Sequence, residues 1–116
     1  MTDVIDEKAL VDQVDGDLEF LEETVVMLDE DSPRLVEQVR AAVVSRDAAA
    51  LVKPAHMLKG MFSNFCAEPA EAAARELEAM GREERMNDVE AAADRLEHET
   101  ARLKEALHLF LSTRIK

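Results

Sequence analysis

The chain has 116 residues, 47% of them apolar, and its 26 acidic against 14 basic residues give a formal net charge of −12. This length suits one domain with a substantial core, and the acidic balance without a basic patch argues against nucleic acid or anionic lipid as a partner. With four Phe, no Trp, no Tyr and three Gly, the core must consist of Leu, Val, Ala and Met, which is typical of helices packed on helices.

The sequence indicates neither a disulfide nor a membrane segment. Cys66 is the single cysteine, so no intrachain disulfide can form and nothing points to an oxidising compartment. The first residues lack the basic start and apolar run of a signal peptide, and no stretch is long enough to span a bilayer. We therefore expect a cytoplasmic protein without membrane contact, and the two termini favour a free-standing one.

The N-terminal segment predicts a short helix. Asp6 is a suitable N-cap, Ile5 is placed to pack against Leu10, and Gly16 ends the turn that follows. Because so short a helix is unstable alone, we expect it to lie across one end of a larger body.

A long second helix is predicted next. Apolar residues recur three and four apart from Leu18 to Ala42, with Ser32 in the one polar position of the seam. Pro33 could instead begin a new helix capped by Ser32. Since the apolar stripe keeps its register across this point, we favour one helix, kinked at Pro33.

The third helix is predicted to be capped by Asp47 and to run to about Cys66. Pro54 lies inside it and removes one backbone hydrogen bond, so a bend is expected just ahead of His56. Its apolar stripe consists of Leu51, Ala55, Leu58, Phe62 and Phe65.

Two further helices follow. Pro69 suits the first turn of a fourth helix, and Gly81 is expected to end that helix. Residues 87–90 have the form of a capping box for a last helix, in which apolar positions recur from Val89 to Phe110.

Short connections between these helices favour antiparallel neighbours. The predicted fold is therefore all-α, an antiparallel up-and-down four-helix bundle with the short N-terminal helix across one end. We predict a single domain over residues 1–116, with its core at about 17–113.

His56 is the most distinctive residue of the third helix. At about 100° per residue it points away from the apolar stripe, and Lys59, Gly60 and Ser63 share its outward side. A histidine on a helix surface is usually a solvated side chain, so the spacing alone does not assign a function.

The motif Ala55-His56-Met57-Leu58-Lys59-Gly60, followed by Leu77-Glu78 and Gly81-Arg82, resembles the histidine-containing phosphotransfer (HPt) domain of two-component phosphorelays. The resemblance implies that His56 accepts a phosphoryl group from a receiver aspartate or a histidine kinase and passes it to a response-regulator receiver. The three glycines form no nucleotide-binding loop, so we expect a phosphoryl carrier and no enzyme with its own ATP site. No metal or cofactor is expected on this chain, and Mg²⁺ is expected on the partner receiver.

Four residues are candidates for roles around His56. Glu78 could accept a hydrogen bond from the imidazole and fix its tautomer, as the resemblance implies. Lys59, one turn along, could hold a phosphoryl oxygen. Gly60 costs about 1 kcal/mol in a helix interior, which suggests room for the phosphorylated ring and an incoming loop, while Arg82 could add positive charge or favour the helix C-terminus.

A docking surface for the partner is expected at the ends of the second and third helices. Met57 and Met61 would form an apolar collar around His56, with Gly60 and Ser63 beside it. Similar domains have small residues after the Lys-Gly pair and a glycine where Cys66 stands. Because cysteine adopts positive φ less cheaply than glycine, we expect the end of the third helix to differ.

Two alternatives remain open. A metal site could use His56, His98 and His108 with Glu97 or Glu99, although His98 and His108 lie beside the apolar stripe of the last helix and the paired motifs of bundle metal sites are missing. The same bundle could also be a non-phosphorylated adaptor that binds and modulates a receiver or kinase domain. For the phosphoryl carrier we expect a monomer.

Overall fold

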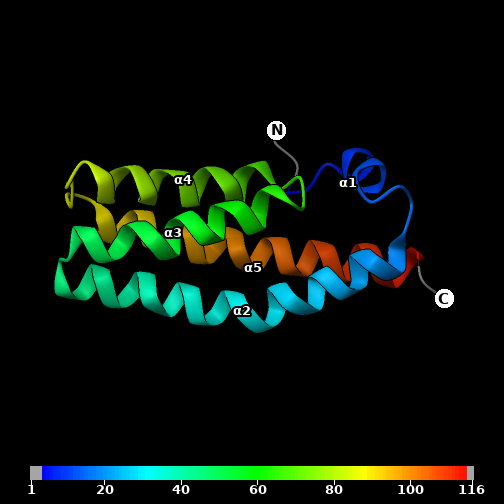
Figure 1. The fold of residues 1–116 in the computed structure, drawn as a ribbon, viewed down its shortest axis with the longest axis horizontal. Coiled ribbons are helices and arrows are strands. Elements are labelled where there is room, and N and C mark those ends of the chain that lie inside the picture. Colours follow the sequence, from blue (N-terminus) through cyan, green and yellow to red (C-terminus); the bar gives the residue numbers. More distant parts are fainter. Residues whose placement is uncertain (1–3, 115–116) are drawn as a thin grey trace.

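The computed structural model describes residues 4–114, which form five helices and no strand (Figure 1). The helices are α1 (Glu7–Gln13), α2 (Leu18–Ser45), α3 (Ala48–Ser63), α4 (Glu68–Arg82) and α5 (Val89–Arg114). The extensive contacts join α2 with α3, α3 with α4, α4 with α5 and α5 with α2, and none of them involves α1. The predicted antiparallel four-helix bundle with a short N-terminal helix at one end is confirmed.

α2 is continuous through Pro33, as predicted, and it bends part-way along its length in Figure 1. Its buried side follows the predicted seam. Ser32 occupies the one polar position of that seam and is fully buried, and its hydroxyl has no hydrogen-bond partner among the described residues. Thr100 of α5, also buried, donates a hydrogen bond to the carbonyl oxygen of Leu96 at 2.7 Å.

Aspartates begin three of the helices. The side chains of Asp6, Asp17 and Asp47 accept hydrogen bonds from backbone N–H groups in the first turns of α1, α2 and α3, at 3.1, 3.0 and 3.1 Å. These contacts satisfy donors that a helix start otherwise leaves without a partner. The predicted caps at Asp6 and Asp47 are therefore present.

α1 is held to the turn between α3 and α4. The backbone N–H of Asp6 donates to the carbonyl oxygen of Cys66 at 3.1 Å, and Gln13 Nε2 donates to the carbonyl oxygen of Asn64 at 2.7 Å. Leu10 is the one fully buried residue of α1. A few specific contacts, with one apolar anchor, therefore fix this helix to the bundle.

Two predictions about helix ends are corrected. α3 ends at Ser63, before the predicted Cys66, and Cys66 adopts a left-handed conformation with φ of 54° in the turn that follows. Gly81 does not end α4, which continues to Arg82. Gly81 is instead buried inside the helix against the backbone of α3, so its small size serves helix packing.

The predicted capping box at the start of α5 is also wrong. Asp88 has a left-handed conformation with φ of 61°, which turns the chain away from capping geometry. Glu90, whose side chain was expected to reach back to Asn87, instead pairs with Arg46 Nη2 at 2.9 Å. An ion pair between the end of α2 and the start of α5 thus replaces the local motif.

Candidate functional site

His56 lies on the outward side of α3, with 60% of its side chain exposed. Its Nδ1 is 3.0 Å from Oε2 of Glu78 on α4, and its Nε2 makes no hydrogen bond to any residue within 4–114. The contact that the sequence led us to expect between these two side chains is therefore present, and it leaves one ring nitrogen open to solvent.

Glu78 is the centre of a small charge cluster. Only 8% of its side chain is exposed, and Lys59 Nζ lies 2.6 Å from its Oε1. Arg82, one turn further along α4, places Nη2 at 2.8 Å and Nε at 3.2 Å from Oε2. One buried carboxylate thus contacts a lysine, an arginine and the histidine ring together.

These contacts keep Glu78 ionised. The Lys59 ammonium lowers the pKa of the Glu78 carboxyl most strongly, and hydrogen bonds from Arg82 and His56 add to this, so that the pKa falls to about 2 although burial opposes the shift. An ionised carboxylate only accepts hydrogen bonds, so the Nδ1 that faces it must carry the proton. The neutral imidazole then has its lone pair on the exposed Nε2.

Lys59 and Arg82 are not oriented as isolated surface cations. Both were expected near His56, and both lie there, but each is bound to Glu78. Each cation is therefore held close to the ring by the same carboxylate that orients the ring.

Gly60 lies on the same outward side, one turn after His56. A Cβ atom at Gly60 would meet nothing within 4 Å, so no packing inside the bundle requires a glycine there. Ser63 is exposed and its hydroxyl donates to the carbonyl oxygen of Gly60 at 2.8 Å. This part of α3 is a bare backbone surface beside the histidine.

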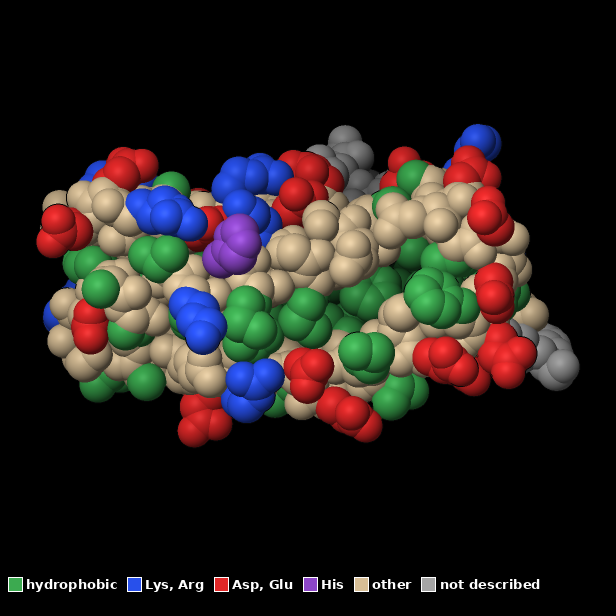
Figure 2. Space-filling model, in the orientation of Figure 1, with side chains coloured by type: hydrophobic (Ala, Val, Ile, Leu, Met, Phe, Trp, Pro, Cys, Tyr) green, Lys and Arg blue, Asp and Glu red, His purple; other side chains and the backbone are tan. Residues whose placement is uncertain are grey.

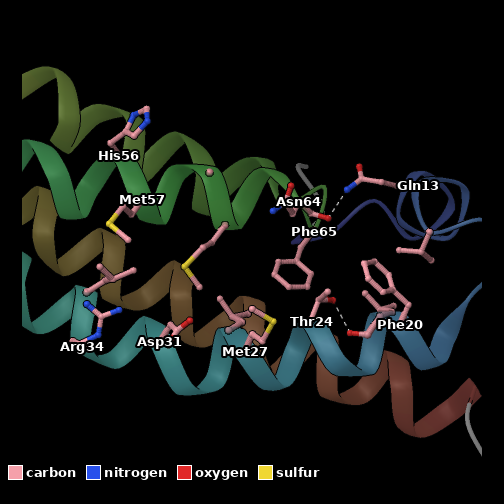
Figure 3. A pocket seen from close by; sticks show the side chains of 16 residues that line it. Gln13, Phe20, Thr24, Met27, Asp31, Arg34, His56, Met57, Asn64 and Phe65 are labelled. Atoms are coloured by element: carbon pink, nitrogen blue, oxygen red, sulfur yellow. Dashed lines mark hydrogen bonds between the residues drawn. The ribbon is translucent and has the colours of Figure 1, made fainter.

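A groove of about 650 Å³ begins beside His56 and runs between α3 and α2 to the end of α1 (Figure 3). Met57 and Met61 line it from α3, in agreement with where the apolar collar was expected. Phe20 and Met27 line it from α2, and they are 52% and 58% exposed. Exposed apolar side chains that are gathered along one groove are typical of a surface used for binding.

The docking surface was predicted at the ends of the second and third helices, but none of the α2 residues that line the groove was named for it. A second row of residues lies beside the buried seam of α2 and faces the groove (Figure 3). Its members are spaced by four, three, four and three, which places them on one helix face. The row consists of Phe20, Thr24, Met27, Asp31 and Arg34. This spacing was readable in the sequence and could have predicted a second, exposed face on the helix.

Charge is unevenly distributed on the face that carries the groove. Figure 2 shows a histidine among Lys and Arg side chains, with hydrophobic side chains continuing from it along a hollow. Acidic side chains gather along the lower edge and at the far end of the same face. In a chain with a net charge of −12, the surroundings of the histidine are locally basic.

The other two histidines lie apart from this cluster. His98 is exposed on α5, and His108 Nε2 contacts Asp29 Oδ2 at 2.8 Å. Within residues 4–114, no group of three or more His, Cys, Asp or Glu side chains could hold a metal ion.

No helix of residues 4–114 has the length and hydropathy needed to cross a membrane.

Comparison with known proteins identifies the family. The model of the Hpt domain family matches residues 23–106, and the chain therefore belongs to that family. Hpt domains are phosphoryl carriers that interact with receiver domains and kinases, so membership supports a phosphotransfer role in a phosphorelay. No curated protein sequence matches the chain.

Two solved structures have the same fold. The crystal structure of histidine-containing phosphotransfer protein B (HptB) from Pseudomonas aeruginosa PAO1 matches with a TM-score of 0.87 and 22% identity, over 97% of this chain and 98% of that one. The HPT domain of the Hpt sensor hybrid histidine kinase from Shewanella matches with a TM-score of 0.81 and 19% identity, over 97% of each chain. At these identities the likeness establishes the fold of the bundle.

Proposed function

We propose that His56 is the phosphoryl-carrying residue of a phosphorelay. It accepts the group on Nε2 from a receiver aspartate or a histidine kinase and passes it to a response-regulator receiver. The observation that carries this proposal is the 3.0 Å contact of His56 Nδ1 with the ionised Glu78. That contact places the proton on Nδ1 and leaves the nucleophilic lone pair on the solvent side.

The chemistry at this site needs no proton transfer. Nε2 attacks the phosphorus of an aspartyl phosphate, the N–P bond forms as the P–O bond breaks, and the aspartate leaves as a carboxylate. The ring gains positive charge during the attack while Nδ1 keeps its proton, and the carboxylate of Glu78 stabilises that charge. In the reverse direction the N–P bond breaks, the electron pair returns to Nε2, and the ring leaves as a neutral imidazole that keeps its proton on Nδ1.

Lys59 and Arg82 serve the phosphoryl group itself. A phosphoryl group brings up to two negative charges next to a carboxylate that is already ionised. Because Lys59 Nζ and the Arg82 guanidinium are held at Glu78, within reach of the ring, they offset part of this repulsion. The receiver domain of the partner supplies the Mg²⁺. The chain itself acts as a monomeric carrier without its own ATP site.

The test is phosphoryl transfer from a panel of labelled phospho-receivers and a histidine kinase to the wild type and to His56→Gln. We expect an acid-labile, alkali-stable label on the wild type and none on the variant. His98→Gln is the matched control, since His98 is an exposed histidine on α5, and it should be labelled like the wild type.

Two results would overturn the proposal. One is equal labelling of His56→Gln and the wild type. The other is a wild type that binds a receiver but stays unlabelled by every donor, which would favour the non-phosphorylated adaptor. Sedimentation velocity of the same samples tests whether the free carrier is a monomer.

A further inference from the structure

Three cations are exceptions in the charge pattern of this protein. Within residues 4–114, every Lys and Arg side chain except Arg34, Lys53 and Lys104 lies within ion-pair distance of a carboxylate. With 26 acidic residues in the chain, carboxylates are plentiful, so a cation without one is unusual. The positions of these three residues are therefore informative.

Two of the three lie at one end of the groove. Arg34 is exposed and lines the groove from α2, on the wall opposite Met57 (Figure 3). Lys53 is exposed on α3, and because it precedes Met57 by four residues it lies on the same helix face, one turn away. The histidine end of the groove is thus flanked by a cation from each of its two walls. We call Arg34 and Lys53 the cation pair.

The opposite end of the groove has a different character. Its lining residues near α1 are Gln13, Val14, Phe20 and Asn64, and none of them carries a charge. Between the two ends lie Met27, Met61 and the single acidic lining residue, Asp31. From Phe20 to Arg34 is fourteen residues of α2, about 21 Å at 1.5 Å per residue. The groove therefore offers about four helical turns of apolar surface with positive charge at one end only.

Lys59 and Arg82 differ from the cation pair in what they can bind. Their charges are directed to Glu78 beneath the ring, at 2.6 and 2.8 Å. Arg34 and Lys53 have no such partner within the described residues, and both stay in contact with solvent. An exposed cation pair beside an apolar groove is suited to carboxylates that arrive on another protein.

We propose that the receiver places an apolar helix in the groove, and that Arg34 and Lys53 select the receiver by binding carboxylates at one end of that helix. This inference rests on the proposed function, because the occupant is the receiver that exchanges its phosphoryl group with His56. The cation pair favours receivers with acidic residues at that end of the helix and rejects those with Lys or Arg there. It also fixes the direction in which the helix lies, since the α1 end of the groove has no cation to offer.

The experiment uses the receiver that labels or binds the wild type in the panel above. Binding to the double variant Arg34→Glu/Lys53→Glu is measured by isothermal titration, and transfer is measured by single-turnover kinetics at increasing receiver concentration. We expect the dissociation constant to rise about 10-fold or more, because like charges then face each other across the interface. The transfer rate at saturating receiver should stay within about twofold of the wild type, because the His56–Glu78 contact is untouched.

Lys104→Glu is the matched control. Lys104 is the remaining cation without an ion pair in residues 4–114, but it lies on α5 beside a different, shallow surface with Pro33 and Thr100. The same charge reversal there should change the dissociation constant by less than about twofold. In about 0.5 M NaCl the difference between the double variant and the wild type should shrink, because screening weakens exposed charge pairs.

The outcomes separate this inference from the proposed function. If the wild type is labelled but Arg34→Glu/Lys53→Glu binds as tightly as Lys104→Glu, the selection by the cation pair is wrong while the carrier role stands. If the double variant binds well but transfers slowly at saturation, the two residues act in the chemistry and the inference is also overturned. If no donor labels the wild type but a receiver still binds it and the charge reversal weakens that binding, the cation pair stands without the carrier role. A wild type that binds no receiver at all contradicts both proposals.

Discussion

A Cβ atom on Gly81 would lie 2.9 Å from the carbonyl oxygen of Ala48, so α4 meets α3 at this point backbone against backbone. The same Cβ would lie 2.9 Å from Cγ2 of Val52. Gly81 follows Glu78 by three residues, and this close approach therefore sets how near Glu78 comes to His56.

Gly81→Ala is expected to destabilise the protein by about 1–3 kcal/mol, because the added methyl group forces the two helices apart. This outcome reverses the usual preference for alanine inside a helix. Urea unfolding measures the loss, and phosphoryl transfer should slow as Glu78 moves away from the ring. An unchanged or increased free energy of unfolding would show that the close approach is not a constraint.

Gly60→Ala should have the opposite effect on stability. Its Cβ meets nothing within 4 Å, so the variant should gain about 0.5–1 kcal/mol from the better helix propensity of alanine. We expect transfer from a receiver to slow several-fold, because the bare surface beside His56 is where the partner approaches. A variant that is more stable and transfers at the wild-type rate would assign Gly60 no part in docking.

Stability should depend on pH through Glu78. Its pKa falls from 4.5 to about 2 on folding, so its contribution is fully present above pH about 4.5 and is lost as the pH falls toward 2. A shift of this size corresponds to roughly 3 kcal/mol. The free energy of unfolding, measured with urea between pH 7 and 2, should therefore change less with pH for Glu78→Gln than for the wild type. Glu76→Gln, an exposed carboxylate of the same helix, is the control, and equal pH dependence of all three proteins would refute the role of Glu78.

Glu78→Gln should also affect function at neutral pH. The amide can still accept a hydrogen bond from Nδ1 but has no charge to stabilise the ring, and replacing such an orienting partner typically costs 10- to 100-fold in activity. Single-turnover transfer at saturating receiver measures this loss. A rate equal to that of the wild type would mean that the charge of Glu78 is not used.

Ser32→Ala is expected to leave stability unchanged or to raise it by up to about 1 kcal/mol. The Ser32 hydroxyl is buried and has no partner among the described residues, so removing it relieves a desolvation cost. Thr100→Val provides the contrast, because it removes a hydroxyl that donates to Leu96 at 2.7 Å and should cost about 0.5–1.5 kcal/mol. A substantial loss in Ser32→Ala would reveal a bonded hydroxyl, for instance through a buried water.

Most of the fold follows from local patterns in the sequence. The seam of α2 kept its register through Pro33, and the buried positions of α5 from Val89 to Phe110 match the predicted stripe. The reason is that helix periodicity is a local property that burial then reinforces. The neighbourhood of His56 and Glu78 was foreseeable only through the resemblance to HPt domains, because a glutamate on a helix is by itself usually a solvated carboxylate.

The errors occur where a contact from elsewhere in the chain overrides a local signal. Glu90 leaves its capping box for Arg46, and Gly81 is used for its small size against α3. Cys66 takes the left-handed conformation that a glycine would adopt at less cost. None of these features can be predicted from the residue and its immediate neighbours, because each depends on the structure of the folded bundle.

The way α1 is attached has a consequence for the groove that it borders. Three hydrogen bonds to residues 64–66, an ion pair of Glu7 with Arg114 and the anchor Leu10 hold this helix, while the other helices share extensive contacts. Amide hydrogens of α1 should therefore exchange with solvent through local opening, well before those of α3. The end of the groove beside α1 should therefore open locally more readily than the histidine end, which lies between the closely packed helices α2 and α3.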